Sequence, residues 1–107
     1  MTDFLDWREH AGSHDKKFYK TTLWQGEHVM VGINCLEPNQ TQPVHAHAGA
    51  DKFYFVLSGE GSFSVGEEEQ TANPGTVVIA PSGISHGVRN NGNERLTLLI
   101  AIAPGVK

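Results

Sequence analysis

A chain of 107 residues has room for one domain with one hydrophobic core. Hydrophobic residues make up 38% of it and charged residues 19%, as in ordinary globular proteins. The formal net charge of −4 argues against a nucleic-acid surface, which needs clustered lysine and arginine. One cysteine cannot form an intrachain disulfide, and the longest apolar run, Leu98 to Pro104, is too short to span a membrane. With no signal-peptide pattern after Met1, we expect a soluble cytoplasmic protein.

The first 17 residues differ in pattern from the rest of the chain. Phe4, Leu5 and Trp7 stand among polar residues, which predicts an N-terminal arm that is irregular or forms one or two helical turns. From Phe18 onward, short apolar runs separated by turn residues are typical of strands. The predicted strands cover residues 18–24, 29–36, 44–47, 53–57, 62–65, 76–80, 84–89 and 96–103.

Turn residues between these runs predict how the strands are connected. Gln25-Gly26-Glu27 is a plausible hairpin turn, and Asn90-Asn91-Gly92-Asn93 is a strong turn sequence because asparagine and glycine tolerate positive φ. We interpret the acidic run Glu67 to Glu69 as a solvated turn. Eight short strands at this spacing predict an all-β sandwich or barrel, as a single domain over residues 18–107.

His45-Ala46-His47 is the first candidate site for chemistry. Alternate residues of a strand share a face, so both imidazoles would project the same way, with their Cα atoms roughly 6.6 Å apart. Two rings at that spacing can converge on one metal ion at metal–nitrogen distances of about 2.0–2.1 Å. Two exposed histidines on one strand would show the same pattern.

A third histidine follows a turn that is built from Pro81 and Gly83. Proline restricts φ, and glycine permits backbone angles that are closed to other residues. The turn would therefore deliver His86 from a distant strand at a defined position. Taken alone, a histidine after a turn is usually a surface residue.

The two segments together resemble the pair of motifs of the cupin superfamily. The first runs from Pro38-Asn39 through the histidine pair and Lys52 to Gly59, and the second runs from Gly75 to Asn90. The resemblance implies a small single-domain cupin, an antiparallel jelly-roll β-barrel whose motifs supply metal ligands. By the same resemblance, His45, His47 and His86 would hold a divalent transition metal, which could be Zn, Fe, Ni, Mn or Cu.

Two positions depart from the family pattern. Asn39 replaces a glycine, a mild change because asparagine also adopts positive φ. Lys52 stands where metal-binding cupins usually have a glutamate ligand. An ammonium about 5 Å from a divalent ion is repelled by roughly 6–7 kcal/mol at an effective dielectric constant near 20. Lys52 would therefore turn away and pair with an acid, be neutral, face an anionic ligand, or exclude the metal.

Strand alternation predicts which neighbours face the interior. Asp51 could replace the missing carboxylate only if a bulge shifted the register, because alternation points it outward. Tyr54 shares the parity of Lys52, so both should face the interior, where they are candidate substrate-binding and catalytic residues; Gln42 could join them at the cavity mouth. We interpret Cys35 as a small buried hydrophobe rather than a metal ligand or nucleophile.

The opposite parity places three apolar side chains, Phe53, Phe55 and Leu57, on the outer face of the barrel. An apolar outer face on so small a barrel favours a homodimer interface or a partner for the N-terminal arm.

Two functional hypotheses follow. The first is a metal-dependent enzyme, of oxidoreductase or isomerase/lyase type, acting on a small oxygen-rich molecule. The second is a non-catalytic cupin module that binds a small ligand, with or without metal. The sequence contains no Ser/His/Asp array and no phosphate-binding glycine loop, so hydrolase and kinase functions lack support.

Overall fold

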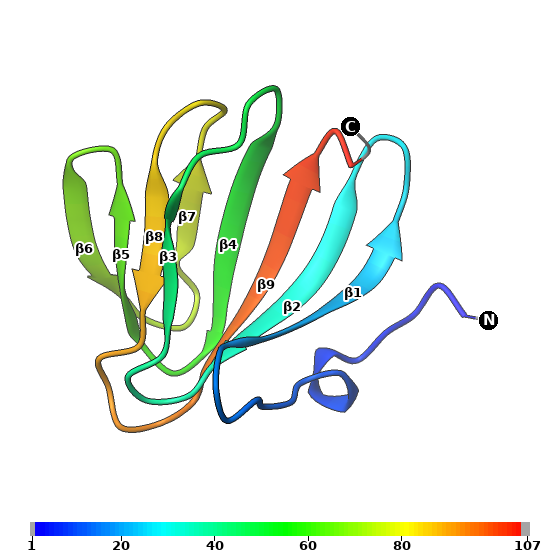
Figure 1. The fold of residues 1–107 in the computed structure, drawn as a ribbon. Coiled ribbons are helices and arrows are strands. Elements are labelled where there is room, and N and C mark those ends of the chain that lie inside the picture. Colours follow the sequence, from blue (N-terminus) through cyan, green and yellow to red (C-terminus); the bar gives the residue numbers. More distant parts are fainter. Residues whose placement is uncertain (1, 106–107) are drawn as a thin grey trace.

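The computed structural model describes residues 2–105, which form nine strands and one short 3₁₀ helix (Figure 1). The helix η1 spans Trp7–Glu9. The strands are β1 (Tyr19–Gln25), β2 (Met30–Leu36), β3 (Thr41–His45), β4 (Asp51–Ser58), β5 (Gly61–Val65), β6 (Glu68–Ala72), β7 (Val77–Ala80), β8 (His86–Arg89) and β9 (Leu96–Ala103). No helix among residues 2–105 is long and apolar enough to cross a membrane.

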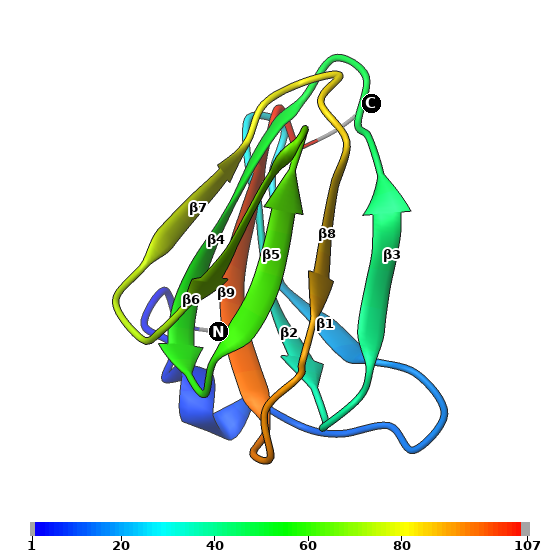
Figure 2. The ribbon, with the colours of Figure 1, turned by 90° about the vertical axis from the view of Figure 1, so that its left-hand side faces the viewer.

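The strands form two sheets, with the orders β1-β2-β9-β4-β7 and β3-β8-β5-β6. Every pairing is antiparallel, and Figure 2 shows the two sheets facing each other. This is the jelly-roll arrangement, so the predicted fold class is confirmed. The predicted hairpin at residues 25–27 is also present, because β1 pairs with β2 and the amide of Gly26 donates to the carbonyl of Val29.

One strand, β6, was not predicted. The acidic run was interpreted as a turn, but only Gly66 and Glu67 connect the strands, and Glu68 already begins β6. Four of the five residues of β6 are exposed, so the strand shows no alternation of apolar and polar residues. It exists because its backbone pairs with the whole length of β5 at the edge of the sheet.

The core lies between the two sheets and follows the predicted alternation. Tyr54 and Val56 of β4 are fully buried, as are Leu96 and Leu98 of β9. Together with residues from β2, β5 and β8 they form one hydrophobic cluster. Fully burying a side chain of this size stabilises the fold by about 1.5–3 kcal/mol, which makes the five-stranded sheet the rigid wall of the barrel.

The turns adopt the backbone angles that the sequence predicts. Asn39 has φ 74° and is the one non-glycine residue with positive φ among residues 2–105, so asparagine does substitute for the usual glycine there. Gly83 has φ 79° in the turn before β8. At the other end of β8, the buried Asn90 donates through Nδ2 to the carbonyls of Leu36 and Glu94, each at 2.8 Å. Asn90 thereby ties the end of β2 to the turn before β9.

The N-terminal arm lies on the outer side of the five-stranded sheet, away from β3 (Figure 2). Asp6 caps η1 by accepting from the amide of Arg8, and Gly12 packs so closely on Tyr19 that an added Cβ would lie 2.9 Å from the ring. Ile33 and Cys35 face this outer side in the register of β2 and are nevertheless fully buried. Cys35 is therefore a buried residue, as predicted, and lies on the opposite face of the sheet from the core cluster.

Replacing Gly59 by alanine should destabilise the fold strongly. Gly59 has φ +80°, and a Cβ there would lie 2.3 Å from the carbonyl oxygen of Arg95. Gly49→Ala is the matched control, since Gly49 has φ +78° with nothing within 4 Å. We expect urea denaturation to show a loss of about 3 kcal/mol for Gly59→Ala and about 1 kcal/mol for the control. Equal losses would show that positive φ alone, and not the contact with Arg95, requires glycine at position 59.

Candidate metal centre

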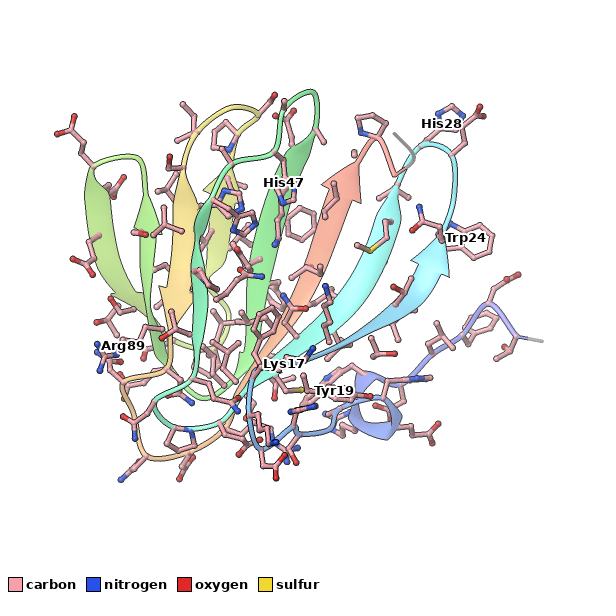
Figure 3. The ribbon with its side chains drawn as sticks, viewed as in Figure 1. Lys17, Tyr19, Trp24, His28, His47 and Arg89 are labelled. Carbon is pink, nitrogen blue, oxygen red and sulfur yellow. The ribbon has the colours of Figure 1, made fainter. Side chains whose placement is uncertain are left out.

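Three histidines from two strands and one loop converge at one end of the barrel. His45 of β3 lies directly opposite His86 of β8 in the register of the second sheet. His47 follows two residues after β3 ends, in the segment that leads to β4 (Figure 3). Their candidate ligand nitrogens all lie within 4.8 Å of one another.

The predicted convergence of the three rings is thus present, but its local cause differs for His47. We expected both histidines of the first motif on one strand, whereas β3 ends at His45. His47 is positioned by tertiary contact instead, because the amide of Gly83 donates to its carbonyl oxygen at 2.8 Å. The turn that delivers His86 therefore also holds the loop that carries His47.

Backbone carbonyls set the tautomers of two of the rings. Nδ1 of His45 lies 2.8 Å from the carbonyl oxygen of Pro43, and Nδ1 of His86 lies 3.1 Å from that of Ile84. Each carbonyl only accepts, so each Nδ1 carries a proton and donates, which leaves the lone pair of each Nε2 directed toward the cluster; Nε2 of His45 pairs there with Nε2 of His47, and Nε2 of His86 has no partner. In both cases the acceptor belongs to the residue two positions before the histidine. The sequence analysis did not identify these carbonyls.

His86 has the environment of a neutral ligand. It is 1% exposed, and its Nε2 is the one buried side-chain nitrogen or oxygen among residues 2–105 that lacks a hydrogen-bond partner. Burial lowers the pKa of His86; the hydrogen bond to Ile84 opposes this in part, and the charges of His45 and Lys52 lower the pKa further. The ring is therefore neutral at pH 7, as a metal ligand must be.

The donor set fits a divalent transition metal. Nε2 of His45 and Nε2 of His47 are 3.3 Å apart. Two nitrogens at about 2.0–2.1 Å from one tetrahedral ion would be separated by about 3.3–3.4 Å. His45 and His47 are half-buried, so the cluster stands between the barrel interior and solvent. Three neutral nitrogens suit Zn, Fe, Ni, Mn or Cu and leave positions for other ligands.

Lys52 points into the barrel, as alternation predicts. It is 4% exposed, and its Nζ lies 4.5 Å from the centroid of the Tyr54 ring. Burial, followed by repulsion from Lys20, lowers the pKa of Lys52 to about 8. No ion pair among residues 2–105 involves Lys52, so it does not turn away to pair with an acid.

Tyr54 and Gln42 lie together beside the histidines. The Tyr54 hydroxyl donates to Oε1 of Gln42 at 2.5 Å, and the ring centroids of Tyr54 and His86 are 6.1 Å apart. Both residues are buried, so Gln42 lies within the barrel wall rather than in a loop. Burial raises the pKa of the Tyr54 hydroxyl well above its usual range, so it is protonated at every physiological pH.

Other sequence candidates lie away from the cluster. Asp51 is exposed and accepts from the amide of Ser82 at 2.8 Å, so it points outward as alternation predicts and does not replace the missing carboxylate. His28 is exposed in the β1–β2 hairpin and lies 3.3 Å from Glu27. Lys20 was not considered from the sequence, although its parity in β1 places it on the inner face of the sheet.

Comparison with known proteins agrees with this fold. A model of the cupin domain matches residues 32–102. The "Oxalate-binding protein" of Thermotoga maritima is 34% identical over 67 residues, which is 63% of this chain and 55% of that protein. "Uncharacterized protein YrkC" of Bacillus subtilis is 27% identical over 92 residues, which is 80% of this chain and 50% of that protein. The chain thus spans about half the length of these two relatives.

A solved structure matches almost the entire chain. TT1209 from Thermus thermophilus is 38% identical, covers 96% of this chain and 98% of its own, and superimposes with a TM-score of 0.92. The family model covers both histidine motifs, the six strands β3 to β8 in full, and most of β2 and β9. On its sequence motifs, its two-sheet fold and these matches, the chain belongs to the cupin family.

Proposed function

We propose that this cupin holds a divalent transition metal on His45, His47 and His86 and uses it to bind a small oxygen-rich molecule. The observation that carries this proposal is the buried Nε2 of His86, which has no partner and faces a cluster of two more imidazoles. Leaving a buried acceptor unsatisfied is unfavourable, and an ion bound between the three rings would satisfy it.

The best-supported activity is metal-dependent catalysis of the oxidoreductase or isomerase/lyase type. When bound, the metal would polarise a carbonyl or enolate, or activate dioxygen if it is iron. The side chains of this protein would bind and orient the substrate. Lys52 would contact its negative charge, while Tyr54, protonated and hydrogen-bonded to Gln42, would position it and act as a donor rather than as a base.

The relative from Thermotoga maritima supports a small oxygen-rich ligand. Its name describes it as oxalate-binding, and oxalate is a small chelating dianion. The identity is 34% over 63% of this chain, so we infer the class of ligand and not the molecule.

A non-catalytic cupin module is the second candidate. Lys52 favours it, because a lysine in place of a carboxylate ligand removes one negative charge from the site and adds a positive one. A protein that holds no metal would exclude the catalytic function, since the catalytic proposal requires a resident ion.

Metal analysis of protein purified without a chelating tag tests the metal site. We expect about one transition-metal ion per chain by mass spectrometry, and a loss of at least tenfold in His86→Ala, because two imidazoles bind much more weakly than three. His28→Ala, on an exposed histidine in the hairpin, should retain the metal. A content near zero in the wild-type protein, unchanged in His86→Ala, would refute the catalytic-metal proposal and favour the binding module.

We further propose that the outer face of the five-stranded sheet joins two copies of the chain. One row of register partners crosses all five strands without a charged residue: Trp24, Val31, Ala101, Phe53 and Ile79. Trp24 is 54% exposed and Ile79 is 55% exposed, while the arm packs against Tyr19 on the same side of the sheet. An uncharged apolar surface of this kind is self-complementary about a two-fold axis.

Ile79→Lys should weaken this dimer. A lysine within this apolar interface would have to be desolvated without a partner, so we expect at least a tenfold higher dissociation constant by sedimentation equilibrium. Val44→Lys is the control, because Val44 is 65% exposed on the other sheet and should leave the dimer intact. A monomeric wild-type protein, or equal effects of the two changes, would refute this interface.

A further inference from the structure

A buried amine without a partner stands beside the histidine cluster. Lys52 is 4% exposed, and within residues 2–105 no ion pair or hydrogen bond is formed by its Nζ. Its one close interaction is with the face of the Tyr54 ring, 4.5 Å away. The Lys52 chain is thus largely buried while its Nζ keeps some contact with solvent, because His86 Nε2 is the one fully enclosed side-chain nitrogen or oxygen without a partner among residues 2–105. An ammonium in so confined a position carries a charge that a bound anion would compensate.

A second lysine faces the same side of the sheet. Lys20 of β1 pairs with Asn34, Asn34 pairs with Leu98, and Leu98 pairs with Val56, which is buried in the core. Cross-strand partners share a face, so Lys20 projects on the inner face, as Lys52 does. Lys20 is exposed, whereas Lys52 is buried. After burial, repulsion from Lys20 is the second cause of the lowered pKa of Lys52.

We propose that Lys52, with Lys20 on the solvent side, forms an anion subsite beside the three-histidine cluster and selects small dicarboxylates as ligands. This inference rests on the proposed function only for the end of the ligand that would bind the metal; the Lys52 end does not depend on it. One carboxylate would reach the histidine-bound metal, and the other would lie against the ammonium of Lys52.

The Tyr54 ring lies next to both Lys52 and His86, the two residues at the ends of the proposed subsite. Nζ of Lys52 lies 4.5 Å from the centroid of the Tyr54 ring, and the His86 ring lies 6.1 Å from that same centroid. Lys52 and a metal on the histidines would both border the Tyr54 ring and would repel each other. A carboxylate on each side removes that repulsion, which explains how a lysine and a cation site can coexist in one barrel.

The charge pattern excludes other classes of ligand. A neutral sugar or alcohol would leave the Lys52 ammonium unpaired, and a cation would be repelled by it. A dianion of three or four carbons would meet opposite charge at both ends. Lys20 stands on the solvent side and would attract such an anion to the opening.

Calorimetric titration with malonate tests the subsite. Malonate is a dianion at pH 7, and malonamide is its uncharged counterpart. With zinc-loaded wild-type protein we expect malonate to bind and malonamide not to compete. Lys52→Met should weaken malonate binding at least tenfold, and Lys20→Met a few-fold. Lys16→Met, at an exposed position in the arm, is the control and should bind as the wild type does.

Stability and zinc content distinguish a lost subsite from a damaged protein. Lys52→Met should raise the melting temperature of the metal-free protein, because it replaces a buried unpaired charge with an apolar chain of similar length. Its zinc content should equal that of the wild type. Weaker malonate binding in a variant that is more stable and fully loaded supports the subsite.

The outcomes separate this inference from the metal proposal. Equal malonate affinity of wild type and Lys52→Met, no malonate binding to the wild type, or equal binding of malonamide would overturn the subsite while zinc binding stands. Malonate binding that depends on Lys52 in a protein that holds no zinc would overturn the metal proposal and retain the lysine subsite.

Discussion

The pairing of β3 with β8 is the interaction on which the site depends. It sets His45 directly opposite His86, and the strands approach so closely that a Cβ at Gly87 would lie 3.0 Å from the Val44 side chain and would force a small shift. The two histidines come from motifs about forty residues apart, yet antiparallel hydrogen bonding places them as cross-strand neighbours. Since β8 also pairs with β5 in the middle of its sheet, a shift of either strand would separate the ligands.

The interior of this barrel contains apolar side chains that stabilise the fold and polar groups that destabilise it. The cluster around Tyr54, Val56 and Leu98 supplies apolar burial. The ammonium of Lys52 lies on the same sheet as these three residues, and the neutral His86 lies on the facing sheet. Buried polar groups without partners are unfavourable in the free protein. In the proposed site a cation would satisfy Nε2 of His86 and an anion would pair with the ammonium of Lys52, so one bound assembly would account for both groups. The carbonyls of Pro43 and Ile84 prepare the site by fixing which imidazole nitrogens are available.

The five-stranded sheet is largely apolar on both faces. Its outer face is covered near β1 and β2 and exposed toward β7. Near β1 and β2, the arm packs on Tyr19, and the outward-facing Ile33 and Cys35 are fully buried. Toward β7 the surface stays exposed, with Ile79 more than half accessible. Antiparallel sheets with one solvated face usually alternate apolar and polar residues. The absence of that alternation in β4 and β7 is therefore the structural basis for the proposed association of two chains.

Sequence alone determined the features that depend on residue type and local spacing: the all-β class, the inward parity of Lys52 and Tyr54, and the positive φ at Asn39; the jelly-roll arrangement was implied by the resemblance to cupins. Each follows from sterics or from the two-residue period of a strand. Only the tertiary structure decided the existence of β6, the placement of His47 beyond its strand, and the position of Lys20 on the inner face near Lys52. These features depend on backbone pairing and on contacts between segments that are distant in the sequence. A local sequence pattern does not predict which segments will come into contact.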